Sequence, residues 1–200
     1  MQKISDTVFA AIDFESAGTA KGQTDVPIQI GIALWSPATG YGETFCSFLH
    51  TDRPVTWAAQ KVHGITTDDL QDAPTLLSLW PVIHRLLAGH VVVAHGHGTE
   101  KRFLRTFPGH PFVPWLDTLH LARAAWPEAK DHSLSALCDL LSVSAAVKER
   151  QPDRNWHDAL FDSLGSLAIL EELLDEHQWT DKPLELLLSP DLSKYHRNRA

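Results

Sequence analysis

The feature that most constrains this chain is an apolar run over residues 8–15, Val-Phe-Ala-Ala-Ile-Asp-Phe-Glu, which ends in two carboxylates one residue apart. The run is bounded by polar residues and is too short for a typical helix, so it predicts a buried strand. Since side chains alternate along a strand, we expect Asp13 and Glu15 to point together from one face and Phe14 to pack in the core behind them.

Two carboxylates in so apolar a strand need a compensating partner, because an unpaired charge is costly to desolvate. No Lys or Arg lies between Lys3 and Lys21, so a metal cation is the plausible partner. An alternative is open at this point: the strand ends one residue early and both acids enter a solvated turn. The segments further along the chain favour the metal.

Composition limits the class of protein. Two hundred residues with 44% hydrophobic content suit one globular domain, and a net charge of −8 argues against a broad basic surface, so any nucleic-acid contact should be local. Cys46 and Cys138 stand alone and no signal peptide is evident, which indicates a reducing cytoplasm. No apolar run reaches about 18 residues, so we expect no membrane span. His95-x-His97 lacks the further close ligands of a structural zinc site.

Two β-type runs follow the first strand. Residues 28–35 and 41–49 are separated by the turn-rich residues 36–40, a spacing that suits a hairpin. The first three strands are therefore expected to form an antiparallel meander. Gln29 and Gly31 interrupt an otherwise apolar strand.

Beyond this meander the hydrophobic period becomes helical, apart from two short apolar runs at 91–94 and 112–116 that are typical of strands. Helices are expected at 55–63, 74–88 with Pro81 as a kink, 99–107, 118–126, 133–141 and 156–177. Residues 148–154 are expected to form a charged loop. We expect one domain over residues 1–177 and a C-terminal tail over 178–200, which forms either an ordered strap or a loose tether.

A strand, a glycine-rich turn and a helix follow one another around His95-Gly-His-Gly, an arrangement in which functional sites often occur. Thr99 is a candidate N-cap of that helix, and Glu100 falls in its first turn. The positive end of a helix dipole favours an acid there even without a catalytic role. A structural and a functional interpretation of Glu100 are therefore both open.

The last long helix opens with His157 and carries Asp162 among the apolar positions of its buried side. An acid in that setting is hard to explain as a solvated residue, although Asp158 and Asp162, at i and i+4, could both lie on the surface. Asp158 is expected to matter little. A neutral imidazole suits proton removal from water near neutral pH, which makes His157 a candidate base.

Three segments together resemble the motifs of the DnaQ-like (DEDDh) 3′-to-5′ exonucleases. They lie, in the family's order, at residues 11–15, 93–104 and 157–162. Supporting segments are similar at residues 62–66, 116–119 and 132–138, and the resemblance covers about residues 6–177. It implies a ribonuclease H-like α/β fold, with a mixed five-stranded sheet, three antiparallel strands first, and helices on both sides.

The resemblance also implies a catalytic site. Asp13 and Glu15 match the metal ligands of the first motif, Asp162 matches the last acid, and His157 matches the general base. Glu100 falls at the position of the remaining acid. The implied cofactors are two divalent cations, Mg²⁺ or Mn²⁺, held by these four carboxylates.

The implied activity is hydrolysis of phosphodiester bonds at the 3′ end of nucleic acid, single-stranded by expectation, with release of nucleoside 5′-monophosphates. DNA, RNA and short oligonucleotides are not distinguished by the sequence. The candidate substrate contacts are Ser16, Lys21, His63, His95, Lys101, Arg102, Lys148, Arg150 and Arg154.

Two positions depart from the family pattern: Glu100 stands where Asp is usual, and Gly96 where Asn is frequent. The longer acid is expected to shift the geometry of the second metal, at a cost in rate or metal preference. Two alternatives follow. One is a module that binds a 3′ end with weakened catalysis, and the other is a proofreading-type subunit that docks on a polymerase or another partner through residues 182–200.

Overall fold

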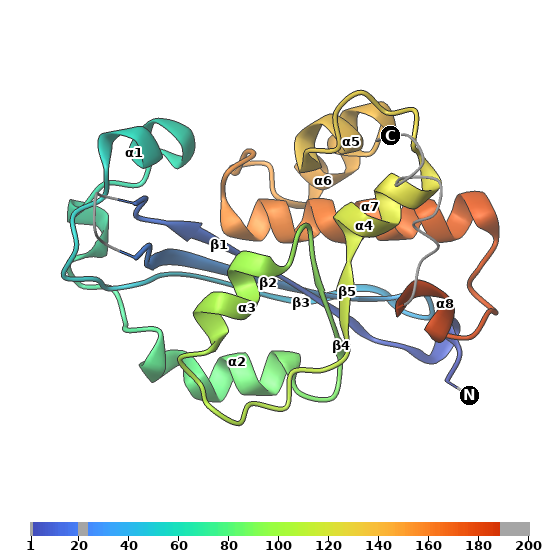
Figure 1. The fold of residues 1–200 in the computed structure, drawn as a ribbon, viewed down its shortest axis with the longest axis horizontal. Helices are drawn as coiled ribbons and strands as arrows, with labels where there is room; N and C mark the ends of the chain where they lie inside the picture. Colours follow the sequence, from blue (N-terminus) through green and yellow to red (C-terminus); the bar gives the residue numbers. More distant parts are fainter. Residues whose placement is uncertain (1, 20–23, 189–200) are drawn as a thin grey trace.

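The computed structural model describes residues 2–19 and 24–188. Its centre is a mixed five-stranded sheet in the order β3-β2-β1-β4-β5 (Figure 1). The first three strands pair antiparallel, whereas β4 runs parallel to β1 and β5 parallel to β4. This confirms the predicted α/β fold with three antiparallel strands first. The strands are β1 (Phe9–Ser16), β2 (Pro27–Ser36), β3 (Gly40–Phe48), β4 (Val91–Ala94) and β5 (Trp115–Asp117).

Helices cover both faces of the sheet, and Figure 1 shows α5, α6 and α7 on one face and α2 and α3 on the other. The helices are α1 (Trp57–His63), α2 (Trp80–Leu87), α3 (Gly98–Leu104), α4 (Thr118–Ala125), α5 (Leu134–Leu140), α6 (Ser144–Arg150), α7 (Ala159–His177) and α8 (Glu185–Leu188), with 3-10 turns at Ile4–Asp6, Asp68–Leu70 and Leu77–Leu79. None of the helices in the described ranges is both long and apolar enough to cross a membrane.

The strand period turns the first two acids toward α7. Along β1, Ala11 packs in the core cluster that contains the buried face of α7, whereas Ile12 and Phe14 pack in the cluster formed with α2 and α3. Asp13 and Glu15 continue the Ala11 set, because every second residue of a strand shares a face. The expectation that Phe14 belongs to the core is confirmed, since it is buried against Phe103.

Several predicted boundaries are wrong. The helix expected from residue 74 is a 3-10 turn at Leu77–Leu79 followed by α2. Pro81 lies in the first turn of α2, where its missing N–H costs no helical bond, rather than at a kink. The N-cap of α3 is His97, so Thr99 lies inside the helix. The charged loop expected at 148–154 begins only after Arg150, because residues 144–150 form α6. The last strand starts only after Pro114, which has no N–H to donate.

The part of the tail that the structure describes lies against the N-terminal segment. The Ile4 N–H donates to the Lys182 carbonyl at 3.0 Å, and the Leu184 N–H donates to the Gln2 carbonyl at 3.0 Å. Leu184 and Leu187 are buried. Residues 178–188 are thus hydrogen-bonded to the body of the protein, and the rest of the predicted tail lies outside the described residues.

Candidate active site

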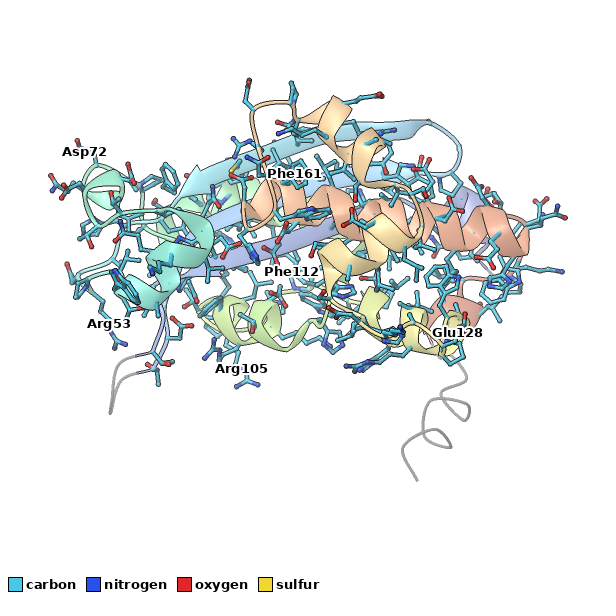
Figure 2. The ribbon with its side chains drawn as sticks, turned by 90° about the horizontal axis from the view of Figure 1, so that it is seen from above. Arg53, Asp72, Arg105, Phe112, Glu128 and Phe161 are labelled. Atoms are coloured by element: carbon cyan, nitrogen blue, oxygen red, sulfur yellow. The ribbon has the colours of Figure 1, made fainter. Side chains whose placement is uncertain are left out.

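The site is built where the end of β1 meets the beginning of α7. Asp13 pairs with Gly31 across the β1–β2 ladder, and Glu15 pairs with Gln29. Directly paired residues of antiparallel strands share a face, so Gly31 and Gln29 also face α7. Figure 2 shows from above how α7 runs along the sheet, with Phe161 near its beginning.

Gly31 allows the helix to approach the sheet. A Cβ atom added at this position would lie 2.2 Å from the main-chain carbon of Ala159, a separation that real atoms do not adopt. The Ser163 hydroxyl donates to the Gly31 carbonyl at 3.0 Å and fixes the contact. The absent side chain therefore brings the first turn of α7, and Asp162 with it, close to the two acids of β1.

His157 and Asp162 meet at the start of α7. The backbone N–H of His157 donates to Asp162 Oδ1 at 3.3 Å, and His157 itself has a left-handed backbone with φ of 67°. One ligand atom each from Glu15, His157 and Asp162 lie within 4.8 Å of one another. His157 is solvent-exposed, whereas the two acids are half-buried. The predicted base and two predicted ligands are thus brought together at a surface edge.

The four acids are close enough to perturb one another. Burial raises the pKa of Asp13 to about 7 and that of Asp162 to about 8, with the Asp13 charge contributing to the second shift. Burial followed by the Asp13 and Asp162 charges raises the pKa of Glu15 to about 9. Burial followed by the Asp13 charge raises the pKa of Glu100 to about 8. Ionising all four near neutral pH therefore requires a nearby cation.

Glu100 projects from the first turn of α3 and is only 6% exposed. Its Oε2 atom is buried and has no hydrogen-bond partner among the described residues. A surface acid that only caps a helix dipole would be solvated, so burial favours the ligand interpretation, while the Glu100 backbone N–H also stabilises the carboxylate at the helix start. Glu100 lies near enough to Asp13 for the two charges to interact, and carboxylate oxygens suit Mg²⁺ or Mn²⁺, so the unpaired oxygen of Glu100 fits a metal ligand.

His63, a predicted substrate contact, is instead bound on both ring nitrogens within the protein. The Ile65 N–H donates to Nδ1 at 3.0 Å, so Nε2 carries the proton and donates to the Ser16 carbonyl at 3.1 Å. His63 therefore attaches α1 to the end of β1. His63 also lines a pocket of about 350 Å³ together with Arg154, Trp156 and His157, so a contact with substrate stays a prediction.

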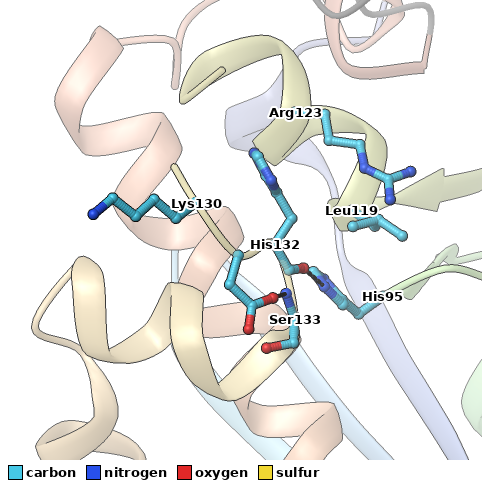
Figure 3. A pocket seen from close by; sticks show the side chains of 7 residues that line it. His95, Leu119, Arg123, Lys130, His132 and Ser133 are labelled. Carbon is cyan, nitrogen blue, oxygen red and sulfur yellow. Dashed lines mark hydrogen bonds between the residues drawn. The ribbon is translucent and has the colours of Figure 1, made fainter. Parts of the chain in front are cut away.

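His95 lies in a second pocket of about 490 Å³ between α4 and the loop before α5 (Figure 3). Its Nε2 donates to the His132 carbonyl at 2.8 Å, and its Nδ1 lies 3.0 Å from the Thr118 hydroxyl. Burial lowers the pKa of His95, so the ring is neutral at pH 7. These bonds tie the turn before α3 to the loop before α5. They fix the His95 ring at the wall of this pocket, and its contact with substrate stays a prediction.

Most of the predicted cationic contacts have partners within the protein. Lys101 Nζ lies 3.0 Å from His97 Nε2, and Arg102 lies 4.0 Å from the Asp25 carboxylate. Arg154 pairs with Asp158. Lys148 donates to the Arg154 carbonyl at 2.6 Å, and the Arg150 guanidinium stacks 3.9 Å above the Tyr41 ring.

Two further predicted contacts remain. Ser16 ends β1 beside Glu15, and Lys21 lies outside the described residues.

The sequence analysis did not identify the residues that hold the start of α7 against the sheet. Asp158, expected to matter little, caps the helix: its Oδ1 accepts the N–H groups of Leu160 and Phe161 at 3.1 and 3.2 Å. Its Oδ2 accepts a hydrogen bond of 2.9 Å from Gln29. One signal in the sequence could have identified these residues: Gln29 and Gly31 interrupt an otherwise apolar strand. The pattern did not indicate which segment they contact.

The chain is similar to known nucleases over most of its length. A family model for exonucleases, RNase_T, matches residues 10–170. The chain is 29% identical over 171 residues to a DNA polymerase III subunit epsilon-like protein of Rhodobacter capsulatus, which covers 83% of the chain and 23% of that relative. It is 30% identical over 132 residues to exodeoxyribonuclease 10 of Escherichia coli K12, covering 66% of the chain and 55% of that relative.

Solved structures agree with the fold. Exonuclease X in complex with 5′ overhanging duplex DNA superposes with a TM-score of 0.68 at 24% identity, over 90% of the chain and 99% of that protein. The nuclease domain of 3′hExo, a DEDDh family member bound to rAMP, superposes with a TM-score of 0.67 at 15% identity, over 88% and 94%. The chain therefore belongs to the exonuclease family, which confirms the DnaQ-like resemblance of its three motifs.

Proposed function

We propose that the protein is a divalent-metal-dependent exonuclease that removes nucleotides from the 3′ end of single-stranded nucleic acid as nucleoside 5′-monophosphates. The observation that carries this proposal is the convergence of Glu15, His157 and Asp162 within 4.8 Å at an edge that solvent reaches, beside the half-buried Asp13 and the buried Glu100. Membership in the exonuclease family supports it.

Asp13, Glu15, Glu100 and Asp162 would hold two divalent cations, Mg²⁺ or Mn²⁺. When bound, such ions lower the pKa of water and stabilise charge on the phosphate and the leaving oxygen. The raised pKa values of the four acids mean that protons neutralise the cluster when no cation is bound. Bound cations would take the place of these protons. The protein contributes a rigid arrangement, since two acids lie on one strand and one lies in the first turn of each of two helices.

His157 would take a proton from the attacking water. Its ring is exposed, and its backbone N–H is fixed by Asp162, so the imidazole stands at the entrance to the acid cluster. A neutral imidazole accepts a proton efficiently near neutral pH. The adjacent pocket of about 350 Å³, which His157 also lines, offers room for the end of a strand.

The substrate is assigned by likeness to proteins that bind DNA or RNA ends. Exonuclease X is solved with 5′ overhanging duplex DNA, and exonuclease I of Escherichia coli with a dT13 oligonucleotide. An acidic chain with net charge −8 suits a short single-stranded end better than a long duplex, because the latter is held by extended phosphate neutralisation.

The proposal is tested with purified protein and a 3′-hydroxyl oligonucleotide labelled at its 5′ end. We expect a shortening ladder with Mg²⁺ or Mn²⁺ and none in EDTA, because the four acids cannot bind water and phosphate productively without cations. Single-stranded DNA, RNA, duplex and dinucleotide substrates in parallel identify the preferred class. Cleavage that persists in EDTA, or a first cut inside the strand, would contradict the assignment.

A further inference from the structure

The buried side chain of Gln29 attaches the first turn of α7 to β2. Gln29 is 3% exposed and makes two hydrogen bonds to consecutive residues of the helix start. Its Nε2 donates to Asp158 Oδ2 at 2.9 Å, and its Oε1 accepts the Ala159 N–H at 3.0 Å. Both ends of the carboxamide are therefore used, and exchanging its oxygen and nitrogen would break both bonds.

Gln29 stands directly between the two halves of the site. It is the ladder partner of Glu15, so it lies beside that acid on the face toward α7. The two residues it binds immediately follow His157 in the chain. One carboxamide thus defines where the residue after His157 sits relative to the strand that carries Glu15.

His157 depends on this attachment because its backbone is unusual. Its left-handed φ of 67° is uncommon for a residue with a side chain and persists only where neighbouring contacts hold it. On one side, its N–H is held by Asp162. On the other side, Asp158 is held by Gln29, by Arg154 and by the helix N–H groups that it caps. Of these, Gln29 is the contact that joins Asp158 to β2, so loosening its bonds would weaken the hold of the sheet on this side of His157.

We propose that Gln29 is a positioning residue for His157: through Asp158 and Ala159, its carboxamide fixes the imidazole at its distance from Glu15 and Asp162. The proposal rests on the proposed function, since it assigns His157 as the base. Gln29 itself does not face the acid cluster with a free polar atom, because both of its polar atoms are bound to α7. Its effect is expected on turnover rather than on substrate binding.

The test exchanges the amide and the carboxylate between the two partners. Gln29→Glu keeps an acceptor for the Ala159 N–H but places a carboxylate against Asp158 Oδ2. We expect kcat to fall about tenfold or more, with KM changed by less than about threefold, as for other residues that orient a catalytic group. In the double variant Gln29→Glu with Asp158→Asn, the new amide donates to the new carboxylate, while the amide oxygen at position 158 still caps the helix. The Asp158→Asn change also removes the ion pair with Arg154. We therefore expect kcat to recover to at least about threefold above that of Gln29→Glu, without reaching the full wild-type rate.

Gln71→Glu is the matched control, because Gln71 also donates to an aspartate, Asp68 at 3.2 Å, but on an exposed turn. It should leave kcat unchanged. A Gln29→Glu variant that melts like the wild type and keeps its kcat would overturn the proposal. So would a kcat loss that the double variant does not restore although it folds, or one that merely follows the folded fraction. An inactive wild type would instead contradict the proposed function.

Discussion

Glu100 is the residue where this chain departs most informatively from its family. An aspartate at the same place would keep the charge on a side chain one methylene shorter. The structure shows the longer side chain buried at 6% exposure, with one oxygen lacking a protein partner among the described residues. A buried carboxylate oxygen without a partner is destabilising unless something else binds it. The position thus retains the features of a ligand, and sequence alone left this open because burial of a first-turn acid depends on distant elements.

If Glu100 holds a cation, Glu100→Gln should lower kcat by at least about 100-fold. It should also raise the melting temperature in EDTA near neutral pH, since the amide avoids the cost of protonating a buried acid on folding. Glu100→Asp should keep substantial activity and alter the ratio of Mg²⁺ to Mn²⁺ rates, because the shorter acid sits on a backbone adapted to the longer one. Rates at saturating metal and melting curves measure both. Glu149→Gln, on the exposed end of α6, is the control. Full activity of Glu100→Gln would remove the residue from the ligand set.

At the scale of elements, the sequence could predict features that depend on a local pattern, and it could not predict contacts between distant segments. The period of two placed Asp13 and Glu15 on one face, and the glycine turn before Glu100 located the second motif. The short helix α6 was missed because Val147 is its only fully buried residue, so it has almost no apolar period. The contact of Gln29 with Ala159 joins residues 130 apart in the chain, and no local pattern reports such a contact.

The approach of α7 to β2 gives a prediction at this scale. Gly31→Ala would place a methyl group 2.2 Å from the helix backbone, so the helix must move. We expect a loss of about 3 kcal/mol, or roughly 6–12 °C in melting temperature, together with reduced turnover as His157 and Asp162 shift. Gly42→Ala is the control on a neighbouring strand, because the nearest atom there is 3.7 Å away, an ordinary contact. Equal melting temperatures of the two variants would show that α7 tolerates the methyl group.

For the whole molecule, the acid cluster links stability to pH and to metal. Asp13, Glu15, Glu100 and Asp162 have pKa values of about 7 to 9 in the folded protein, against ordinary values of 3.8 to 4.5. The folded state therefore binds more protons than the unfolded state between these limits. The stability that these four groups contribute is fully present below about pH 4. It falls as the pH rises and is lost once the pH has passed through 7 to 9.

We therefore expect the melting temperature in EDTA to fall between pH 6 and pH 8.5. Mg²⁺ should raise it more at pH 8.5 than at pH 6, because cations bind the ionised cluster and must displace protons at the lower pH. Other titrating groups contribute to the slope, so the comparison is with Asp162→Asn, which removes one acid at nearly constant volume. This variant should show a shallower fall in EDTA and a smaller gain from Mg²⁺. Identical slopes and gains for the two proteins, measured by differential scanning fluorimetry across the range, would mean that the four carboxylates do not act as one cation-binding cluster.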